Sequence, residues 1–185
     1  VGAVRTHSAT GLRFQLTDVG RAAYLVQKAG SYSFDVAFNA FAVSARSTGR
    51  IDTRNESLAV DATVGYGTLP APEAFTPGSQ TGGIASNRVV TAATPLATLP
   101  GLEFPKSAIV VGSDASGKHY RTTVGLSTFV GLMPMADLEH APITVHDDSP
   151  CTVDVWVDSH GYVSRVGGSF VGGSFDITLL SLIHI

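Results

Sequence analysis

The hydrophobic periodicity of the chain changes near its start. Thr17 and Asp18 are favourable helix caps, and the apolar residues after them recur at the spacing of one helix face until Gly30, a stop signal. After Gly30 the period falls from 3.6 to 2, because aromatic and aliphatic residues alternate with polar ones over residues 31–39. The pattern predicts a helix over 17–30 that leads directly into a long strand with an aromatic face.

The clearest strand pair lies at residues 152–166. Three valines alternate there with polar residues and with Trp156, the only tryptophan in the chain, which is the pattern of a strand with two different faces. Residues 158–161 (Asp-Ser-His-Gly) then place Asp at the first and Gly at the last position of a turn. The sequence predicts a β-hairpin here.

Weaker patterns predict the other elements. Gly and Pro make residues 65–83 a long loop, and an apolar segment with Gly and Pro predicts a short broken helix over 127–138. A helix followed by an antiparallel meander is the simplest assembly. The further predicted strands are 47–53, 58–64, 88–93, 107–113, 118–126 and 175–179.

Composition narrows the class of protein. Hydrophobic residues make up 44% and charged residues 15% of the 185 residues, with 20 Gly and 9 Pro, which is typical of one globular, β-rich domain. The net charge of −3 comes without a basic patch, so we expect no nucleic-acid partner. The single cysteine, Cys151, excludes an intramolecular disulfide and any cysteine-based metal cluster.

The two ends of the chain require separate interpretation. Val1 is not an initiator Met, and we expect the chain to be a fragment that is truncated at both ends. Residues 180–185 (Leu-Ser-Leu-Ile-His-Ile) are the translation of CTG TCT CTT ATA CAC ATC, which resembles a sequencing adapter. We therefore expect a single domain over 1–179, followed by an adapter artefact over 180–185. No apolar run approaches the roughly 18 residues of a membrane span.

Motifs for catalysis are missing from the sequence. It contains no G-x-S-x-G, no H-E-x-x-H, no P-loop and no G-x-G-x-x-G after a strand, so we expect no enzyme activity and no cofactor. The densest set of metal-binding side chains is Glu139-His140 followed by His146-Asp147-Asp148. A solvated loop and a metal site built from His140, His146 and Asp148 are both open interpretations, and the loop is favoured because nothing fixes these residues on one face.

Aromatic and aliphatic side chains on strands are abundant instead. Antiparallel sheets covered by one helix layer can enclose an apolar cavity, and ligand pockets are usually lined by such residues. Periodicity does not separate an open cavity from a filled core. A ligand-binding domain and a non-catalytic cell-surface structural or interaction domain with a filled core are therefore both compatible with the pattern.

Four segments, taken in order, resemble a known family. The helix that ends Lys28-Ala29-Gly30 runs into Ser31-Tyr32-Ser33-Phe34, and Thr48-Gly49-Arg50-Ile51-Asp52 follows. Lys118-His119-Tyr120-Arg121 then precedes Val155-Trp156-Val157-Asp158-Ser159-His160-Gly161. This order is similar to the LolA-like lipoprotein superfamily, and especially to the LppX/LprG-type cell-envelope lipoproteins of actinobacteria.

The resemblance implies an α+β fold, in which a curved antiparallel β-sheet (half-barrel) wraps on one or a few helices. It also implies an exported cell-envelope protein, membrane-anchored or secreted, that carries lipid or glycolipid in an apolar cavity without covalent chemistry. A membrane contact would require an anchor outside this chain. The family has no catalytic motif to transfer, so only cavity-wall residues are proposed: Tyr32, Phe34, Val36, Phe38, Tyr120, Phe129, Met133 and Trp156.

Overall fold

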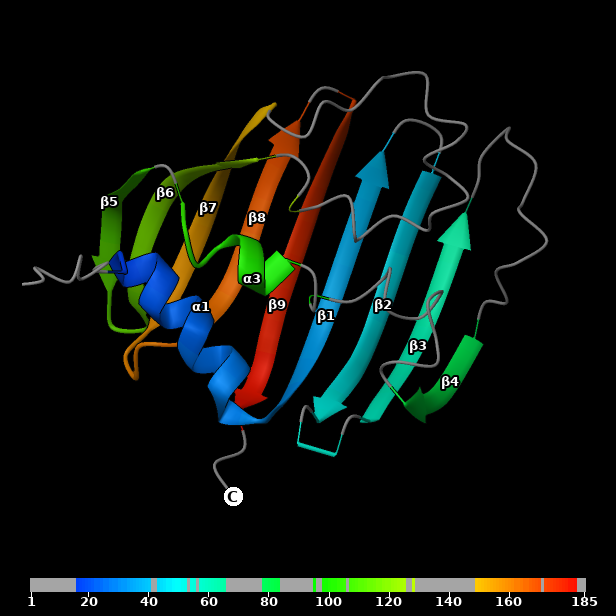
Figure 1. Ribbon diagram of the computed structural model, residues 1–185. Coiled ribbons are helices and arrows are strands. Elements are labelled where there is room, and N and C mark those ends of the chain that lie inside the picture. The colour runs from blue at the N-terminus through cyan, green and yellow to red at the C-terminus, as the bar shows by residue number, and fades with distance from the viewer. Residues whose placement is uncertain are drawn as a thin grey trace, which may run out of the picture.

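The structure is a computed structural model of the chain. It describes residues 16–40, 43–52, 54–55, 57–65, 78–83, 95, 98–105, 107–125, 128, 149–170 and 172–182. The described strands form one antiparallel sheet in the order β4-β3-β2-β1-β9-β8-β7-β6-β5 (Figure 1). The elements are α1 (Asp18–Ala29), β1 (Ser31–Ala40), β2 (Val43–Asp52), β3 (Ser57–Gly65), β4 (Gly78–Gly83), α3 (Thr98–Gly101), β5 (Ser107–Asp114), β6 (Gly117–Gly125), β7 (Pro150–Asp158), β8 (Val163–Phe170) and β9 (Gly173–Leu182).

Helix α1 begins and ends where the sequence predicts. The hydroxyl of Thr17 accepts a hydrogen bond from the amide of Gly20 at 3.0 Å, which satisfies one of the free donors of the first turn. Gly30 ends the helix in the left-handed region, with φ 85°, a conformation that a residue with a Cβ adopts only at a cost. The apolar stripe of α1 is buried and consists of Val19, Ala22, Ala23 and Val26.

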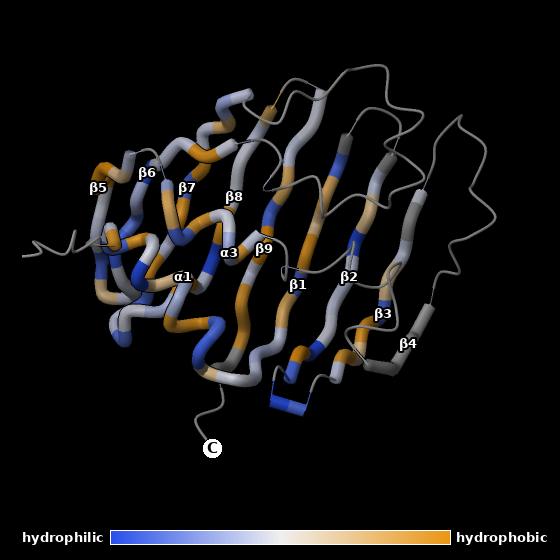
Figure 2. Tube along the Cα trace, viewed as in Figure 1, coloured by the Kyte–Doolittle hydropathy of each residue, from blue (hydrophilic) through white to orange (hydrophobic). Residues whose placement is uncertain are grey.

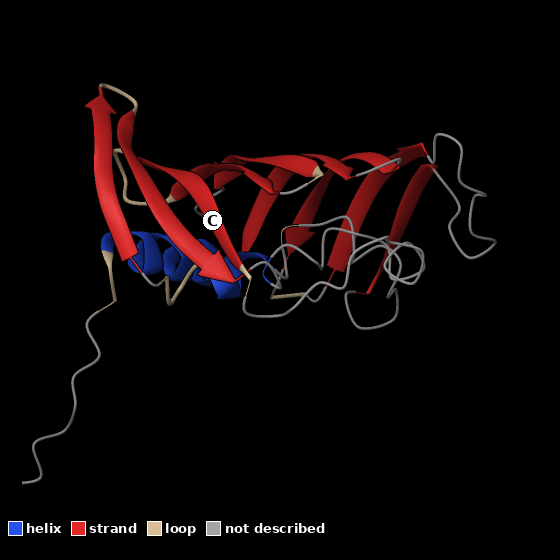
Figure 3. Ribbon diagram, turned by 90° about the horizontal axis from the view of Figure 1, so that it is seen from above, coloured by secondary structure: helices blue, strands red, loops and turns tan. Residues whose placement is uncertain are grey.

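The sheet curves, and α1 and α3 lie on one side of it (Figure 3). We call this side the inner face and the opposite side the outer face. Helix α1 packs on β1, β7, β8 and α3. Buried apolar residues alternate with more exposed ones along β1, β7 and β9, so that every second residue contributes to the inner face. Figure 2 colours the apolar positions of the chain orange.

The register of the strand pairs places inner-face residues of neighbouring strands opposite one another, in rows that run across the sheet. Val36 lies opposite Ile177, which lies opposite Val166 on its other side, and Val166 lies opposite Val155. These four side chains are at most 2% exposed. The row continues to Tyr120 on β6 and, in the other direction, to Ser47 and Ala62 on β2 and β3. The core is therefore a single layer that spans seven strands.

The predicted hairpin is confirmed as β7 and β8. One carboxylate oxygen of Asp158 accepts hydrogen bonds from the amides of His160 and Tyr162, both at 2.9 Å. Gly161 takes the left-handed conformation that the turn requires, with φ 87°. Asp and Gly thus perform the turn roles that their positions predict.

Some predicted boundaries are wrong. Residues 78–83 form β4 at one edge of the sheet, although the sequence places them in a loop, because an edge strand of Gly, Ser, Gln and Thr has no apolar face to reveal it. Strand β9 extends to Leu182 and pairs with β1 along its length. The adapter interpretation of 180–185 stays a prediction.

Other predictions fall on residues that the structure does not describe. The strand over 88–93 lies outside the described residues, as do the acidic loop 139–148 and the helix over 127–138 except for Thr128. Within the described ranges, no helix is both long and apolar enough to cross a membrane.

Candidate functional site

The structure brings four of the predicted cavity-wall residues together on strand β1. Tyr32, Phe34, Val36 and Phe38 all project from the inner face and are 1–2% exposed. Burial raises the pKa of the Tyr32 phenol, since the phenolate would lose its hydration. Phe34 lies over Gly49 of β2, where an added Cβ would meet the Phe34 ring at 2.8 Å. The aromatic wall therefore depends on a glycine in the neighbouring strand.

Tyr120 contributes to the same face from β6. It is 3% exposed, and its hydroxyl donates a hydrogen bond to Oδ2 of Asp18 at the start of α1, at 2.9 Å. Burial, together with the hydrogen bond and negative charge of Asp18, raises the Tyr120 pKa to about 12. This contact ties the N-terminal end of α1 to the far half of the sheet.

Trp156 does not share this wall, so its placement among the cavity residues is wrong. It alternates with Val155 and Val157, which are buried on the inner face, and it therefore projects from the outer face. The two remaining predicted residues, Phe129 and Met133, lie outside the described residues. The same holds for His140, His146 and Asp148, and within the described part of the chain no group of three His, Cys, Asp or Glu residues could hold a metal ion.

Sequence reasoning did not select several residues that complete the inner wall. Ile177 and Leu179 of β9 lie between β1 and β8, and their alternation with polar neighbours was the available signal. The strand order, in which the last strand inserts next to the first, is what brings them there. The further inner-face residues of β2 and β3 are Ala45, Ile51, Leu58, Val60 and Ala62.

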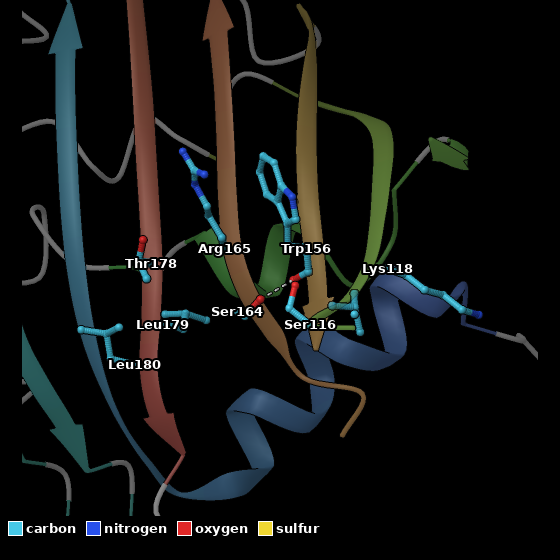
Figure 4. Close-up of a pocket in the computed structure, with 10 residues that line it drawn as sticks. Ser116, Lys118, Trp156, Ser164, Arg165, Thr178, Leu179 and Leu180 are labelled. Atoms are coloured by element: carbon cyan, nitrogen blue, oxygen red, sulfur yellow. Dashed lines mark hydrogen bonds between the residues drawn. The ribbon is translucent and has the colours of Figure 1, made fainter. Parts of the chain in front are cut away.

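The outer face carries a cluster built around Trp156. The ring of His119 stacks on the indole with centroids 4.4 Å apart and planes 4° apart, and the guanidinium of Arg165 lies 4.7 Å from the indole centroid. Figure 4 shows Trp156 and Arg165 side by side on β7 and β8. The indole is thus held between a histidine and an arginine, in a fixed orientation.

The carboxylates of Asp154 and Asp176 hold the two arginines of this cluster in place. Asp154 accepts hydrogen bonds from His119 Nε2 at 2.9 Å and from Arg121 Nε at 3.1 Å. Partial burial acts to raise the Asp154 pKa, but the bonds from Arg121 and His119 outweigh it and hold the pKa below its usual value. Asp176 accepts from Arg165 Nε at 3.0 Å. Each arginine therefore has its own carboxylate.

Two open depressions flank the Trp156–Arg165 pair. One has a volume of about 330 Å³ and is lined on its other sides by Ser116, Ser164, Thr178 and Leu180, among others. The second has a volume of about 340 Å³, and Gly167 and Ala37 are among the residues that line it. Both are centred on outer-face residues, although the buried residues Val157 and Leu179 also line the first and Phe175 the second.

Comparison with solved structures identifies the architecture. The lipoprotein LppX of Mycobacterium tuberculosis matches 88% of this chain and 91% of its own, with a TM-score of 0.54 and 12% identity. LprF from Mycobacterium bovis matches 88% of this chain and 89% of its own, with a TM-score of 0.54 and 13% identity. This chain has the LppX fold. The α+β half-barrel that the resemblance implies is thereby confirmed.

The two solved structures match this chain in fold, at low sequence identity. No protein-family model matches the chain, and no curated protein matches its sequence. Identities of 12% and 13% show the fold alone and carry no information about the function of the inner face.

Proposed function

We propose that the chain is an exported lipid-binding or lipid-carrier domain of the cell envelope, whose inner face holds the acyl chains of a lipid or glycolipid without covalent chemistry. The observation that carries this proposal is the buried, predominantly apolar face of an open sheet, which runs from Ala62 on β3 past Ser47 on β2 to Tyr120 on β6. Acyl chains need a long apolar surface and few polar contacts, and this face supplies both.

The burial of the wall defines how a ligand enters. Phe34 and Phe38 are 1% exposed and Ile51 is 0% exposed, so protein atoms cover these side chains in this structure. Acyl chains therefore replace protein contacts against the wall, and the inner face must open for binding. An apolar ligand that replaces apolar contacts leaves the buried area nearly constant, which keeps the cost of the exchange low.

A matched pair of variants on β3 tests the proposal. Ala62 is buried on the inner face, whereas Ala59 is exposed on the outer face of the same strand. We expect Ala62→Leu to weaken binding of a fluorescent fatty-acid probe about tenfold, or about 1.4 kcal/mol, and Ala59→Leu to leave it unchanged. Native mass spectrometry and lipid extraction of the purified wild-type protein should in addition find bound acyl lipid.

The contradicting result is equally specific. Wild-type protein that carries no acyl lipid and binds no fatty-acid probe would reject the carrier function, and equal probe affinity of the two leucine variants would reject the inner face as the site. Circular dichroism of Ala62→Leu checks that the variant is folded, because overpacking a core costs about 1–3 kcal/mol.

The near-complete burial of the wall also favours a second function, a non-catalytic cell-surface structural or interaction domain with a filled core. In that case Phe34→Ala destabilises the fold by about 3–5 kcal/mol, and added lipid does not restore stability. In a carrier, saturating fatty acid raises the melting temperature of the wild type and of the variant.

A further inference from the structure

The outer face carries a feature that lipid binding leaves unused. The cluster of His119, Arg121, Asp154, Trp156, Arg165 and Asp176 stands on the face opposite the apolar wall, and the side chains of its two arginines are about half exposed. Most of its polar atoms are held by bonds within the cluster, so their positions are set before any ligand arrives.

The floor of the depression beyond Trp156 is a glycine. Gly167 lies between Asp154 on β7 and Asp176 on β9 in the same row of the sheet. An added Cβ there would lie 3.5 Å from Asp176 Oδ2 and 3.7 Å from Trp156 Cζ3, which are ordinary contacts. A side chain would therefore fit without strain, and its absence leaves the hollow of about 340 Å³. That volume is at the small end of the range for ligand pockets.

The charges of the cluster indicate what class of ligand fits. Asp154 is bonded to Arg121 and Asp176 to Arg165, so the formal charges of the two carboxylates and the two guanidiniums cancel. This paired set favours neither an anion nor a cation, and Lys118, which lines the other depression, is the one further charged residue among the lining residues. The site offers fixed acceptors on the carboxylates, fixed donors on Arg165, and the exposed amide of Asn39 at the rim.

An apolar surface stands beside these polar groups. The faces of the indole are occupied by His119 and Arg165, but its Cζ3 edge faces the space above Gly167. A sugar ring matches this combination, because its hydroxyls both donate and accept hydrogen bonds while its C–H groups form an apolar patch. The depression on the other side of the Trp156–Arg165 pair adds the hydroxyls of Ser116, Ser164 and Thr178 (Figure 4).

We propose that the two depressions flanking Trp156 and Arg165 on the outer face are adjacent subsites for a neutral oligosaccharide chain. Two hollows that share one pair of side chains suit a chain ligand better than a single sugar. The site is separate from the lipid proposal, since Trp156 and the polar groups that form it lie on the opposite face, although the buried residues Val157, Leu179 and Phe175 also line the depressions.

Trp156 provides a direct readout because it is the only tryptophan. The experiment titrates the full chain with maltohexaose, cellohexaose and mannohexaose, and follows intrinsic fluorescence. The hexamers of galacturonic acid and of glucosamine serve as anionic and cationic probes. We expect at least one neutral hexasaccharide to give a saturable change of Trp156 fluorescence, and the two charged hexamers to give none.

The variants locate the site. Gly167→Val places a branched side chain on the floor of the hollow while retaining Trp156, and we expect it to weaken binding at least tenfold. Ala59→Val makes a similar change on the outer face of β3, away from the cluster, and should bind as the wild type does. Asn39→Ala, at an exposed position, should weaken binding by severalfold and serves as the second variant if Gly167→Val does not fold.

Three results would overturn the proposal. The first is that no neutral hexasaccharide gives a saturable fluorescence response at millimolar concentration. The second is that only a charged hexamer gives a response. The third is that Gly167→Val and Asn39→Ala both bind with wild-type affinity.

Discussion

The contact between Tyr120 and Asp18 allows a quantitative test of how α1 is attached to the sheet. Tyr120→Phe removes one hydroxyl and no apolar surface. Because Asp18 is exposed, water replaces the lost donor, and we expect a cost of about 1 kcal/mol at neutral pH, near the middle of the range for one hydrogen bond.

The raised pKa of Tyr120 gives this cost a characteristic pH dependence. The phenol titrates near 10 in the unfolded chain and at about 12 in the folded protein. Its contribution to the free energy of unfolding is therefore fully present below pH 10 and is lost as the pH rises toward 12, by about 1.4 kcal/mol per pH unit. The advantage of the wild type over Tyr120→Phe should vanish near pH 11.

Urea unfolding followed by circular dichroism between about pH 8 and 11 measures this difference. Tyr24→Phe is the matched control, since Tyr24 is 40% exposed on α1, and it should leave stability unchanged across the range. A difference between wild type and Tyr120→Phe that stays constant with pH would refute the buried, protonated state of Tyr120. No difference at pH 8 would refute the attachment itself.

Three further substitutions test the local structure, each by urea unfolding. Gly49→Ala should destabilise the fold by about 1–3 kcal/mol through overpacking, since its Cβ would lie 2.3 Å from the carbonyl oxygen of Ala59; a neutral effect would mean that β2 and β3 shift freely. Asp158→Ala should cost about 1–2 kcal/mol because two turn amides lose their acceptor, and Asp158→Asn should recover part of it. Thr17→Ala should cost about 1 kcal/mol at the helix cap, whereas Thr17→Ser should cost much less; equal losses would contradict the capping role.

Local signals predicted the elements with the strongest periodicity. Thr17 and Gly30 bound α1 because capping and left-handed conformations depend on neighbouring residues alone. The Asp158–Gly161 turn is set in the same way. The LppX fold was reached from the order of such segments, while the 12% and 13% identities to solved structures carry little sequence signal.

The face assignments that the sequence could not predict depend on pairing between strands that are distant in the sequence. Trp156 was grouped with Tyr32 because both are aromatic strand residues, yet the alternation within β7 already separates Trp156 from the valines that face the core. Strands β8 and β9 lie between β7 and β1 in the sheet. These two strands, and a register shift next to Trp156, determine which side of β7 lies on the same face as the aromatic side of β1. The cluster of His119, Trp156 and Arg165 spans three strands and has no sequence motif.

The most direct test of the central claim is a photoaffinity experiment with a long-chain fatty acid that carries a diazirine near the middle of its chain. After irradiation, peptide mass spectrometry locates the covalent adducts. The account predicts adducts on inner-face residues such as Phe34, Val36 and Phe38 of β1, which unlabelled fatty acid suppresses. Adducts confined to exposed apolar residues such as Ile109 and Val110 of β5, or adducts that competitor does not suppress, would contradict it.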